Sequence, residues 1–265
     1  MTLTRISDAD YRRIDAISQS SCTQALSSSG DEFRKRQEEG FIATDRMKLG
    51  TLIHAMILEP ETVSDRFMKI PKLDRRKTES KVILAEAEDS KKIVIDEQSW
   101  QIAESVREEI LKEKKSRILF ENGISEISCF NLFNDVRVKG KIDYLHKEKR
   151  IIVDLKTTEI DLNDDSLDYV LEQKNYKVQS AFYIDLLKKE LGDDFTFCFL
   201  FVNVKNLSMR KVIVSDQVAN DYIDHGRRLY TSGIEKIIKW KSENFYPKSI
   251  DSVFIPKAKA WRANK

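Results

Sequence analysis

Two acidic residues near the middle of the chain have the type and spacing needed to bind a divalent cation, and a lysine lies beside them. Asp154 and Lys156 lie two residues apart in the run RIIVDLKTT, and Asp143 precedes them in the run VKGKIDYL. On a β-strand the side chains alternate between faces, so Asp154 and Lys156 share a face. Val153 and Leu155 then point into the core.

The two acids are expected to meet because a short polar turn, residues 146–150, joins their strands. If the turn centre lies between Glu148 and Lys149, antiparallel partners have residue numbers that sum to 297, as Asp143 and Asp154 do. Residues directly opposite on such a pair have Cβ atoms about 5 Å apart. A slip of one residue would separate the carboxylates, so the register is a prediction.

Two carboxylates beside a buried sheet repel each other, and burial increases the free-energy cost of keeping both of them charged. A divalent cation relieves the repulsion, and Mg²⁺ prefers a few carboxylates together with waters and phosphate oxygens. Such a site can polarise a phosphodiester and supply a metal-bound hydroxide. A neighbouring lysine can orient or deprotonate the attacking water, or stabilise developing charge. The alternative is a surface salt bridge between Asp154 and Lys156, with Asp143 flanking the turn.

The surrounding sequence predicts alternating helices and strands. Residues 124–158 are rich in β-branched residues and predict three consecutive strands, with further strands near 67–70, 195–204 and 209–215. Apolar residues at helical spacing predict helices from about residue 21 and at 44–58, 97–119, 166–190 and 216–243. Pro60 ends the second of these. Residues 72–80 are expected to be loop-rich and the tail 244–265 irregular. The pattern indicates an α/β or α+β domain.

Composition favours an ordered globular protein. The chain has 265 residues, of which 41% are hydrophobic and 34% charged, enough for one large core. No apolar run approaches the ~20 residues that span a bilayer. The polar N-terminus lacks the apolar middle of a signal peptide, so a cytoplasmic location is expected.

The three cysteines, Cys22, Cys129 and Cys198, form no CxxC pair. Their spacing argues against a zinc ribbon or an iron–sulfur cluster and favours buried thiols.

The net charge of +2 does not indicate a nucleic-acid binder by itself. Basic residues form local clusters: Arg34–Arg36, Arg75–Lys77, Lys112–Arg117 and, in the tail, Lys257–Lys265. Such clusters are usually solvated faces. Phosphate binding requires basic residues that gather on one face of the protein. The absence of a GxxxxGK[ST] loop indicates that ATP is not used.

These motifs together resemble the RecB-type branch of the PD-(D/E)XK nucleases, and within it the RecE-type (exonuclease VIII) nucleases of phage recombination. The resemblance covers most of the chain. It rests on five segments in the family's order, with QSAFY following the DLKTT motif: LGTLIHAMILEP at 49–60, SEISCF at 125–130, KGKIDYL at 139–145, DLKTT at 154–158 and FYPKSIDSVFIPKAKAW at 245–261. Lys141 and Ile142 stand where the family often has Arg and Pro, and neither is a metal ligand.

The resemblance implies a role for each motif residue. His54, Asp143 and Asp154 are expected to bind metal, with the backbone carbonyl of Leu155 as a further ligand, and Lys156 is expected to be the catalytic lysine. Glu126 is a possible additional ligand for the metal or the DNA end. Without the resemblance, His54 is a histidine satisfied on an apolar helix face and Glu126 an exposed strand residue.

Gln179 and Tyr183 lie four residues apart on a predicted helix and therefore share a face. The resemblance implies that this face borders the catalytic lysine and the scissile phosphate. The alternative is a tyrosine packed on the sheet with a glutamine at its edge. Other aromatic residues, including Trp100, Trp240 and Phe199, are expected in the core.

The implied fold is α/β, a PD-(D/E)XK core with a central mixed β-sheet flanked by helices. We expect a single nuclease domain over 1–265, with a mostly helical part (1–120), a catalytic sheet core (121–215) and a C-terminal helix and tail (216–265). The implied activity is Mg²⁺-dependent 5′-to-3′ exonuclease action on double-stranded DNA ends, leaving 3′ overhangs; Mn²⁺ can substitute. A ring-shaped trimer or tetramer, a single-strand annealing partner, and a bacterial or phage-infected bacterial cytoplasm are also implied, with no membrane.

Two other functions remain open on the sequence. One is an endonuclease of the same fold, either restriction-like or CRISPR-associated. The cysteine count argues against the iron–sulfur cluster usual in the CRISPR-associated group, and no separate target-recognition segment is visible. The other is an inactive DNA-binding or interaction module, against which the intact Asp143, Asp154 and Lys156 set argues.

Overall fold

The computed structural model describes residues 3–39, 43–71 and 91–248. The predicted loop at 72–80, the basic cluster Arg75–Lys77 and the tail from residue 249 onward lie outside the described residues.

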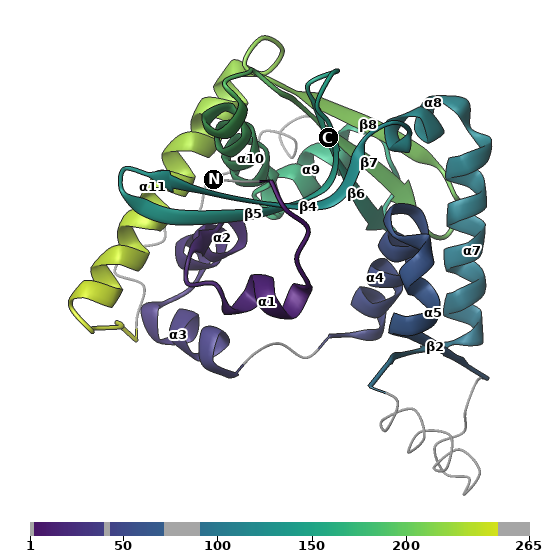
Figure 1. Cartoon of the computed structure of the whole chain (residues 1–265), viewed down its shortest axis with the longest axis horizontal. Coiled ribbons are helices and arrows are strands. Elements are labelled where there is room, and N and C mark those ends of the chain that lie inside the picture. The colour runs from purple at the N-terminus through teal and green to yellow at the C-terminus, as the bar shows by residue number, and fades with distance from the viewer. Residues whose placement is uncertain (1–2, 40–42, 72–90, 249–265) are drawn as a thin grey trace, which may run out of the picture.

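A mixed β-sheet forms the centre of the described part (Figure 1). Its strands in chain order are β1 (Ile17–Ser18), β4 (Ile124–Phe133), β5 (Val136–His146), β6 (Ile151–Thr158), β7 (Thr196–Asn203) and β8 (Met209–Val214). β5 pairs antiparallel with β4 and β6, and its first half pairs parallel with β1. β6 runs parallel to β7, and β8 pairs antiparallel with β7. A central mixed sheet of this kind matches the predicted fold class.

A second, two-stranded parallel sheet lies apart from the first. β2 (Phe67–Ile70) pairs with β3 (Ile93–Asp96). The sequence predicted β2 at these bounds but did not predict its partner.

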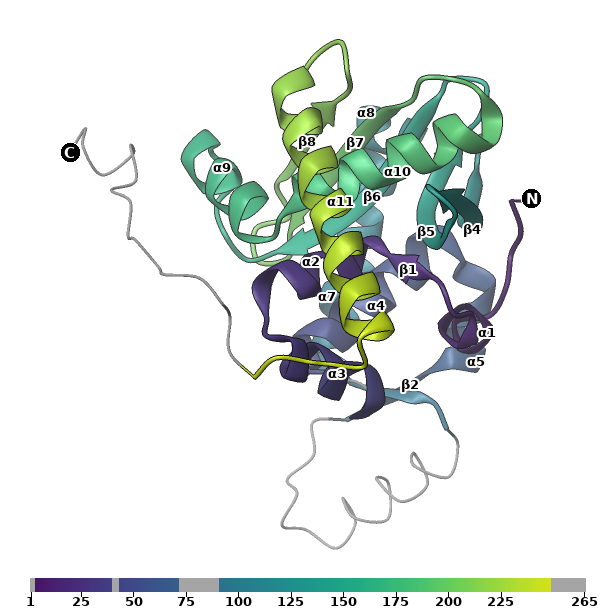
Figure 2. The ribbon, with the colours of Figure 1, turned by 90° about the vertical axis from the view of Figure 1, so that its left-hand side faces the viewer.

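Helices cover both faces of the central sheet. The helices of the described residues are α1 (Asp8–Arg13), α2 (Gln19–Ser27), α3 (Gly30–Glu39), α4 (Asp45–Leu58), α5 (Val63–Arg66), α7 (Glu97–Lys112), α8 (Lys114–Arg117), α9 (Asp164–Gln173), α10 (Tyr176–Leu191) and α11 (Asn220–Ser242), with short 3₁₀ turns at Pro60–Thr62 and Ile118–Phe120. In Figures 1 and 2, α2, α10 and α11 lie on one side of the sheet and α4 with α7 on the other.

Each face has its own hydrophobic core. Phe197, Phe199 and Phe201 of β7 pack in the cluster that includes α2, α10 and α11. Leu200 and Val202 of the same strand pack in the cluster that includes α4 and α7. A strand buried on both faces reads as a continuous apolar run, which explains the sequence FTFCFLFVNV.

Several predicted elements are confirmed, with ends shifted by a few residues. The three strands over 124–158, the strand pair β7–β8, and α4 after its N-cap Thr44 lie where the pattern placed them. The N-cap of α2 is Ser18, whose hydroxyl accepts from the Ser21 amide. All three cysteines are buried and free, as expected.

Two helix predictions were wrong in extent. The single helix predicted over 166–190 is two helices, because Asn175 between α9 and α10 has a left-handed backbone (φ 51°) that an α-helix cannot contain. The helix predicted over 97–119 ends at Lys112 and continues as α8 and a 3₁₀ turn. β1 was also not predicted, because a two-residue strand leaves no periodic pattern.

Among the described residues, no helix combines the length and the apolarity needed to cross a bilayer.

Candidate metal centre

Three carboxylates stand in one row across three adjacent strands. The β4–β5 pairs on either side place Glu126 opposite Asp143. The β5–β6 pairs, from Tyr144–Val153 onward, follow the predicted sum of 297. Asp143 and Asp154 occupy the next position of this register, so the row runs from Glu126 through Asp143 to Asp154.

The β5–β6 ladder opens at the row itself. Its last backbone pair is Tyr144–Val153. One step further, the Leu155 amide donates a hydrogen bond to Asp143 Oδ2 at 3.0 Å in place of a backbone carbonyl. The side chain of Asp143 therefore lies between the two strands, where it is fixed by the backbone of β6.

His54, Glu126 and Asp143 form the closest set of potential metal ligands. One ligand atom of each lies within 4.8 Å of the others, the only such His, Cys, Asp or Glu group found in the described ranges. His54 Nδ1 is 3.4 Å from Asp143 Oδ2. Glu126 has a left-handed backbone (φ 50°), which costs a non-glycine residue about 1–3 kcal/mol and is common at functional sites. The group joins one helix, α4, to two strands.

Asp154 is adjacent to this group but is engaged differently. The carboxylate is buried at 3% exposure. Its Oδ2 accepts a hydrogen bond from Gln179 Nε2 at 2.7 Å. Its Oδ1 lies 2.5 Å from Lys156 Nζ but has no hydrogen-bond partner of good geometry. A buried carboxylate oxygen without a hydrogen bond is costly, and a cation beside it removes that cost.

Lys156 lies between this carboxylate and an aromatic ring. Its ammonium is 4.9 Å from the ring centroid of Tyr176 and 6.0 Å from that of Phe199. Burial alone would lower the pKa of Lys156, but the charges of Asp154, Tyr176 and Asp143 together outweigh it, and the pKa is raised. Lys156 is therefore a charged ammonium held at one place.

The acids at the row are crowded. Burial, followed by the charges of Asp154 and Glu126, raises the pKa of Asp143 well above its ordinary value. Burial lowers the pKa of His54, although Asp154 opposes the shift. A protonated Asp143 and a neutral His54 are the forms that the protein stabilises without a cation. Binding of a divalent cation requires the carboxylate form and a neutral imidazole.

Lys141 is a site residue whose role the sequence analysis did not identify. Its ammonium lies 2.8 Å from Glu126 Oε2 and 2.5 Å from Asp8 Oδ1. A signal was present: Lys141 and Asp143 have the same two-residue spacing on β5 as Asp154 and Lys156 on β6. The contact with Asp8 had no signal, because α1 is far away in sequence.

Helix α10 supplies the side chains that cover the row. Gln179 binds Asp154, and the hydroxyl of Tyr183 donates to the Lys141 carbonyl oxygen at 3.0 Å. A Cβ added at Gly140 would lie 2.8 Å from the Tyr183 ring, so a glycine there lets the helix approach β5. Gln179 and Tyr183 share a face, as predicted, and both contact the strands of the site.

The residues fit a divalent cation. Two carboxylates and an imidazole converge, and a bound cation would relieve the repulsion among the crowded acids. The structure brings together His54, Glu126 and Asp143, with Asp154 and Lys156 beside them. The backbone amide of Leu155 donates a hydrogen bond to Asp143. The role of the Leu155 carbonyl as a metal ligand stays a prediction.

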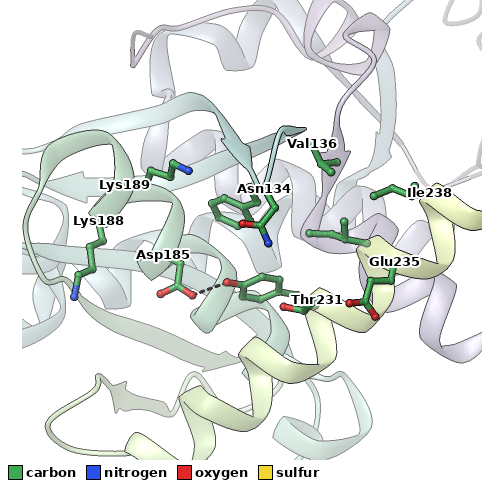
Figure 3. Close-up of a pocket in the computed structure, with 11 residues that line it drawn as sticks. Asn134, Val136, Asp185, Lys188, Lys189, Thr231, Glu235 and Ile238 are labelled. Carbon is green, nitrogen blue, oxygen red and sulfur yellow. Dashed lines mark hydrogen bonds between the residues drawn. The ribbon is translucent and has the colours of Figure 1, made fainter.

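A separate pocket lies away from this centre. It has a volume of about 480 Å³ and is lined by the β4–β5 turn, α10 and α11 (Figure 3). Asp185, a half-buried acid in its lining, already accepts hydrogen bonds from Tyr230 and Arg227. None of the residues that line it belongs to the metal centre, so the pocket adds no group to its chemistry.

Comparisons with known proteins agree with this fold. A family model described as a PDDEXK-like domain of unknown function (DUF3799) matches residues 18–254. The crystal structure of a protein titled "Putative exonuclease" from Eubacterium rectale is similar, with a TM-score of 0.68, 13% sequence identity and 98% of each chain covered. At this identity the similarity shows the fold alone. A structure of SSO0001 matches with a TM-score of 0.37, 11% identity and coverage of 84% of this chain and 77% of that one, too low to support an argument. No curated protein matches the sequence.

Proposed function

The chain belongs to the family of PDDEXK-like domains designated DUF3799, and from this membership and the site we propose that it is a Mg²⁺-dependent DNA exonuclease. The proposed reaction is 5′-to-3′ hydrolysis from double-stranded DNA ends, which leaves 3′ overhangs, and Mn²⁺ is proposed to substitute for Mg²⁺. A ring-shaped trimer or tetramer and a single-strand annealing partner belong to the same proposal. The direction of hydrolysis, the ring and the partner rest on the sequence resemblance.

One observation carries the proposal. Glu126, Asp143 and Asp154 stand in a row across β4, β5 and β6, with His54 and Lys156 beside the row. A surface salt bridge between Asp154 and Lys156 would not need a buried carboxylate, a second acid in register and a histidine from another element. Three acids in one row, with an ammonium beside them, are a site for a hard cation.

The chain's own residues have distinct roles in this proposal. A bound divalent cation polarises a phosphate and lowers the pKa of a water. His54, Glu126 and Asp143 hold the cation, with Asp154 completing the set. Gln179 fixes the orientation of Asp154 through its 2.7 Å hydrogen bond. Lys156 presents a fixed positive charge near the row, where it stabilises negative charge that develops on a phosphate.

Tyr176 is expected to position Lys156 for this role. A desolvated cation–π interaction is worth about 2 kcal/mol, which corresponds to about thirtyfold in rate. We therefore expect Tyr176→Leu to lower kcat about thirtyfold, with little change in KM. Tyr176→Phe keeps the ring and should retain a rate within about threefold of the wild type. Steady-state kinetics of both variants measure the difference.

Melting temperatures provide the control for Tyr176. A purely structural role would lower the rates of both variants only as far as their stability falls. Equal rates for the Phe and Leu variants would contradict the positioning role.

Digestion of matched DNA substrates tests the proposed function. The protein is incubated with a linear duplex and with a covalently closed circle of the same sequence, in Mg²⁺, in Mn²⁺ and in EDTA. We expect loss of the linear duplex alone, only with a divalent cation. Linear substrates carrying a 5′-phosphate or a 5′-hydroxyl, labelled at the 5′ or 3′ end, report the end preference and direction.

Each other outcome identifies an alternative. Cutting of the circle would indicate an endonuclease of the same fold. No cleavage with either cation would indicate an inactive DNA-binding or interaction module. The variant Asp143→Asn, purified in parallel, controls for contaminating nucleases.

A further inference from the structure

A large groove beside the metal centre has a charge unlike the rest of the protein. It has a volume of about 950 Å³ and is lined by α1, the following segment with β1, α2, α3 and the end of α11. Figure 1 shows α1, α2 and α3 gathered below β5. The groove therefore brings N-terminal elements next to β5, because Lys139 and Lys141 of that strand also line it.

The groove concentrates positive charge. Its lining has seven cationic side chains and three acidic ones: Arg12, Arg13, Arg34, Arg36, Lys139, Lys141 and Lys241 against Asp8, Asp15 and Glu38. The net charge of the lining is +4. The whole chain has a net charge of +2, so the residues outside the groove sum to −2. Cations gathered on one face are the feature expected of a phosphate-binding surface, and the sequence alone could not show this gathering.

Within the described part of the chain, two of these cations form no ion pair, although the charge of Arg12 contributes to lowering the pKa of Asp8. Arg12 and Arg36 are exposed, and among the described residues neither forms an ion pair or a side-chain hydrogen bond. Other cations of the groove are already paired: Lys241 with Asp15, and Lys141 with Asp8 and Glu126. Arg12 and Arg36 therefore keep their charge available for an external anion.

The groove is continuous with the metal centre. Lys141 lines the groove and lies 2.8 Å from Glu126, a member of the ligand group. Asp8 lines it too and binds the same lysine. An anionic polymer that follows the groove therefore arrives one side chain away from the proposed cation.

The size of the groove favours an unpaired strand. The groove has a volume of about 950 Å³, which is small beside a B-DNA duplex, whose major groove alone is about 12 Å wide. A single strand carries one phosphate per ~3.4 Å, so several phosphates fit along the groove.

We propose that this groove binds a single strand of DNA through its phosphates, with Arg12 and Arg36 as contacts, and leads that strand to the metal centre. The identity of the polymer rests on the proposed function. The strand would be the one separated from its complement at the site of hydrolysis. The groove then explains how a protein of nearly neutral net charge can hold a polyanion.

Binding without cleavage tests the proposal. A fluorescein-labelled single-stranded oligonucleotide is titrated with the full chain in EDTA, at salt concentrations from 50 to 200 mM, and Kd is measured by anisotropy. The plot of log K against log salt has a negative slope, and each lost phosphate contact reduces its magnitude by about 0.7 for a single strand. We expect this decrease for Arg12→Ala and for Arg36→Ala, and about twice as much for the double variant.

Arg228→Ala is the matched control. Arg228 is exposed on α11, lies outside the groove lining, and forms no ion pair with the described residues. Its removal should leave the slope unchanged. Unchanged slopes for both groove variants, an equal decrease for Arg228→Ala, or an effect seen with a blunt duplex and not with the single strand would each overturn the proposal.

The two proposals can fail separately. Groove-dependent binding in EDTA without any cleavage in Mg²⁺ would support the groove and contradict the nuclease. Cleavage in Mg²⁺ by both arginine variants with wild-type KM would support the nuclease and contradict the groove.

Discussion

Replacing Asp143 with asparagine is expected to lower DNA cleavage by at least about a hundredfold, the usual effect of removing one electrostatic group at a reacting centre. The same variant is expected to be more stable than the wild type when no metal is present. Activity and stability change in opposite directions because the charge of Asp143 serves the cation and opposes the fold.

The stability gain follows from the direction of the pKa shift. Burial and the charges of Asp154 and Glu126 raise the pKa of Asp143 above its unfolded value. The folded protein therefore binds more protons than the unfolded chain between these two pKa values, and its stability falls as pH rises through that window. Asparagine removes this loss, and its oxygen can still accept the Leu155 amide.

Thermal melting in EDTA from pH 5 to pH 9 measures the effect, and each kcal/mol corresponds to about 2–4 °C for a domain of this size. The gain should be smallest at the acid end and grow toward the alkaline end. Asp135→Asn, at an exposed position in the β4–β5 turn, is the control and should show neither effect. A variant that cleaves at the wild-type rate, or that melts lower at every pH, would remove Asp143 from the proposed role.

Replacing Lys156 with methionine is expected to lower cleavage by about 10²–10³-fold and to destabilise the metal-free protein. The variant keeps the unbranched stem but leaves Asp154, a buried carboxylate, without its cation. Removal of one partner of a buried pair costs about 3–5 kcal/mol. Lys156→Met and Asp143→Asn should thus have opposite effects on the stability of the metal-free protein.

Added Mg²⁺ should reverse part of the loss in Lys156→Met. A ligand that binds only the folded state stabilises it by about 2.7 kcal/mol at a hundred times its Kd, and the unpaired Asp154 gives the cation a stronger site. The increase in melting temperature with Mg²⁺ should therefore exceed that of the wild type. If Mg²⁺ stabilised the variant less than the wild type, Asp154 would not be a ligand of the proposed cation.

Lys205→Met is a matched control for this experiment. Lys205 forms an ion pair with Glu159 at 2.8 Å, but both side chains are well exposed. Exposed pairs of this kind contribute about 0–1 kcal/mol, so the variant should melt near the wild type and cleave normally.

The sequence by itself determined the hairpin at the centre of the site. Alternation of side chains along β5 and β6 and the length of their polar turn set the register, which put Asp143 and Asp154 at matched positions. The continuous apolar run of β7 determined a strand buried on both faces. These features follow from local geometry, because the period of a strand and a tight turn leave few arrangements.

Only the tertiary structure decided which groups meet at the site and how. His54 comes from α4, Gln179 and Tyr176 from α10, and the contact of Lys141 with Asp8 joins residues 133 positions apart. The left-handed backbone at Glu126 and the gathering of cations along the groove likewise depend on how separate elements pack. Contacts between distant segments arise from the burial of two cores on the faces of one sheet, and no local pattern in the chain encodes them.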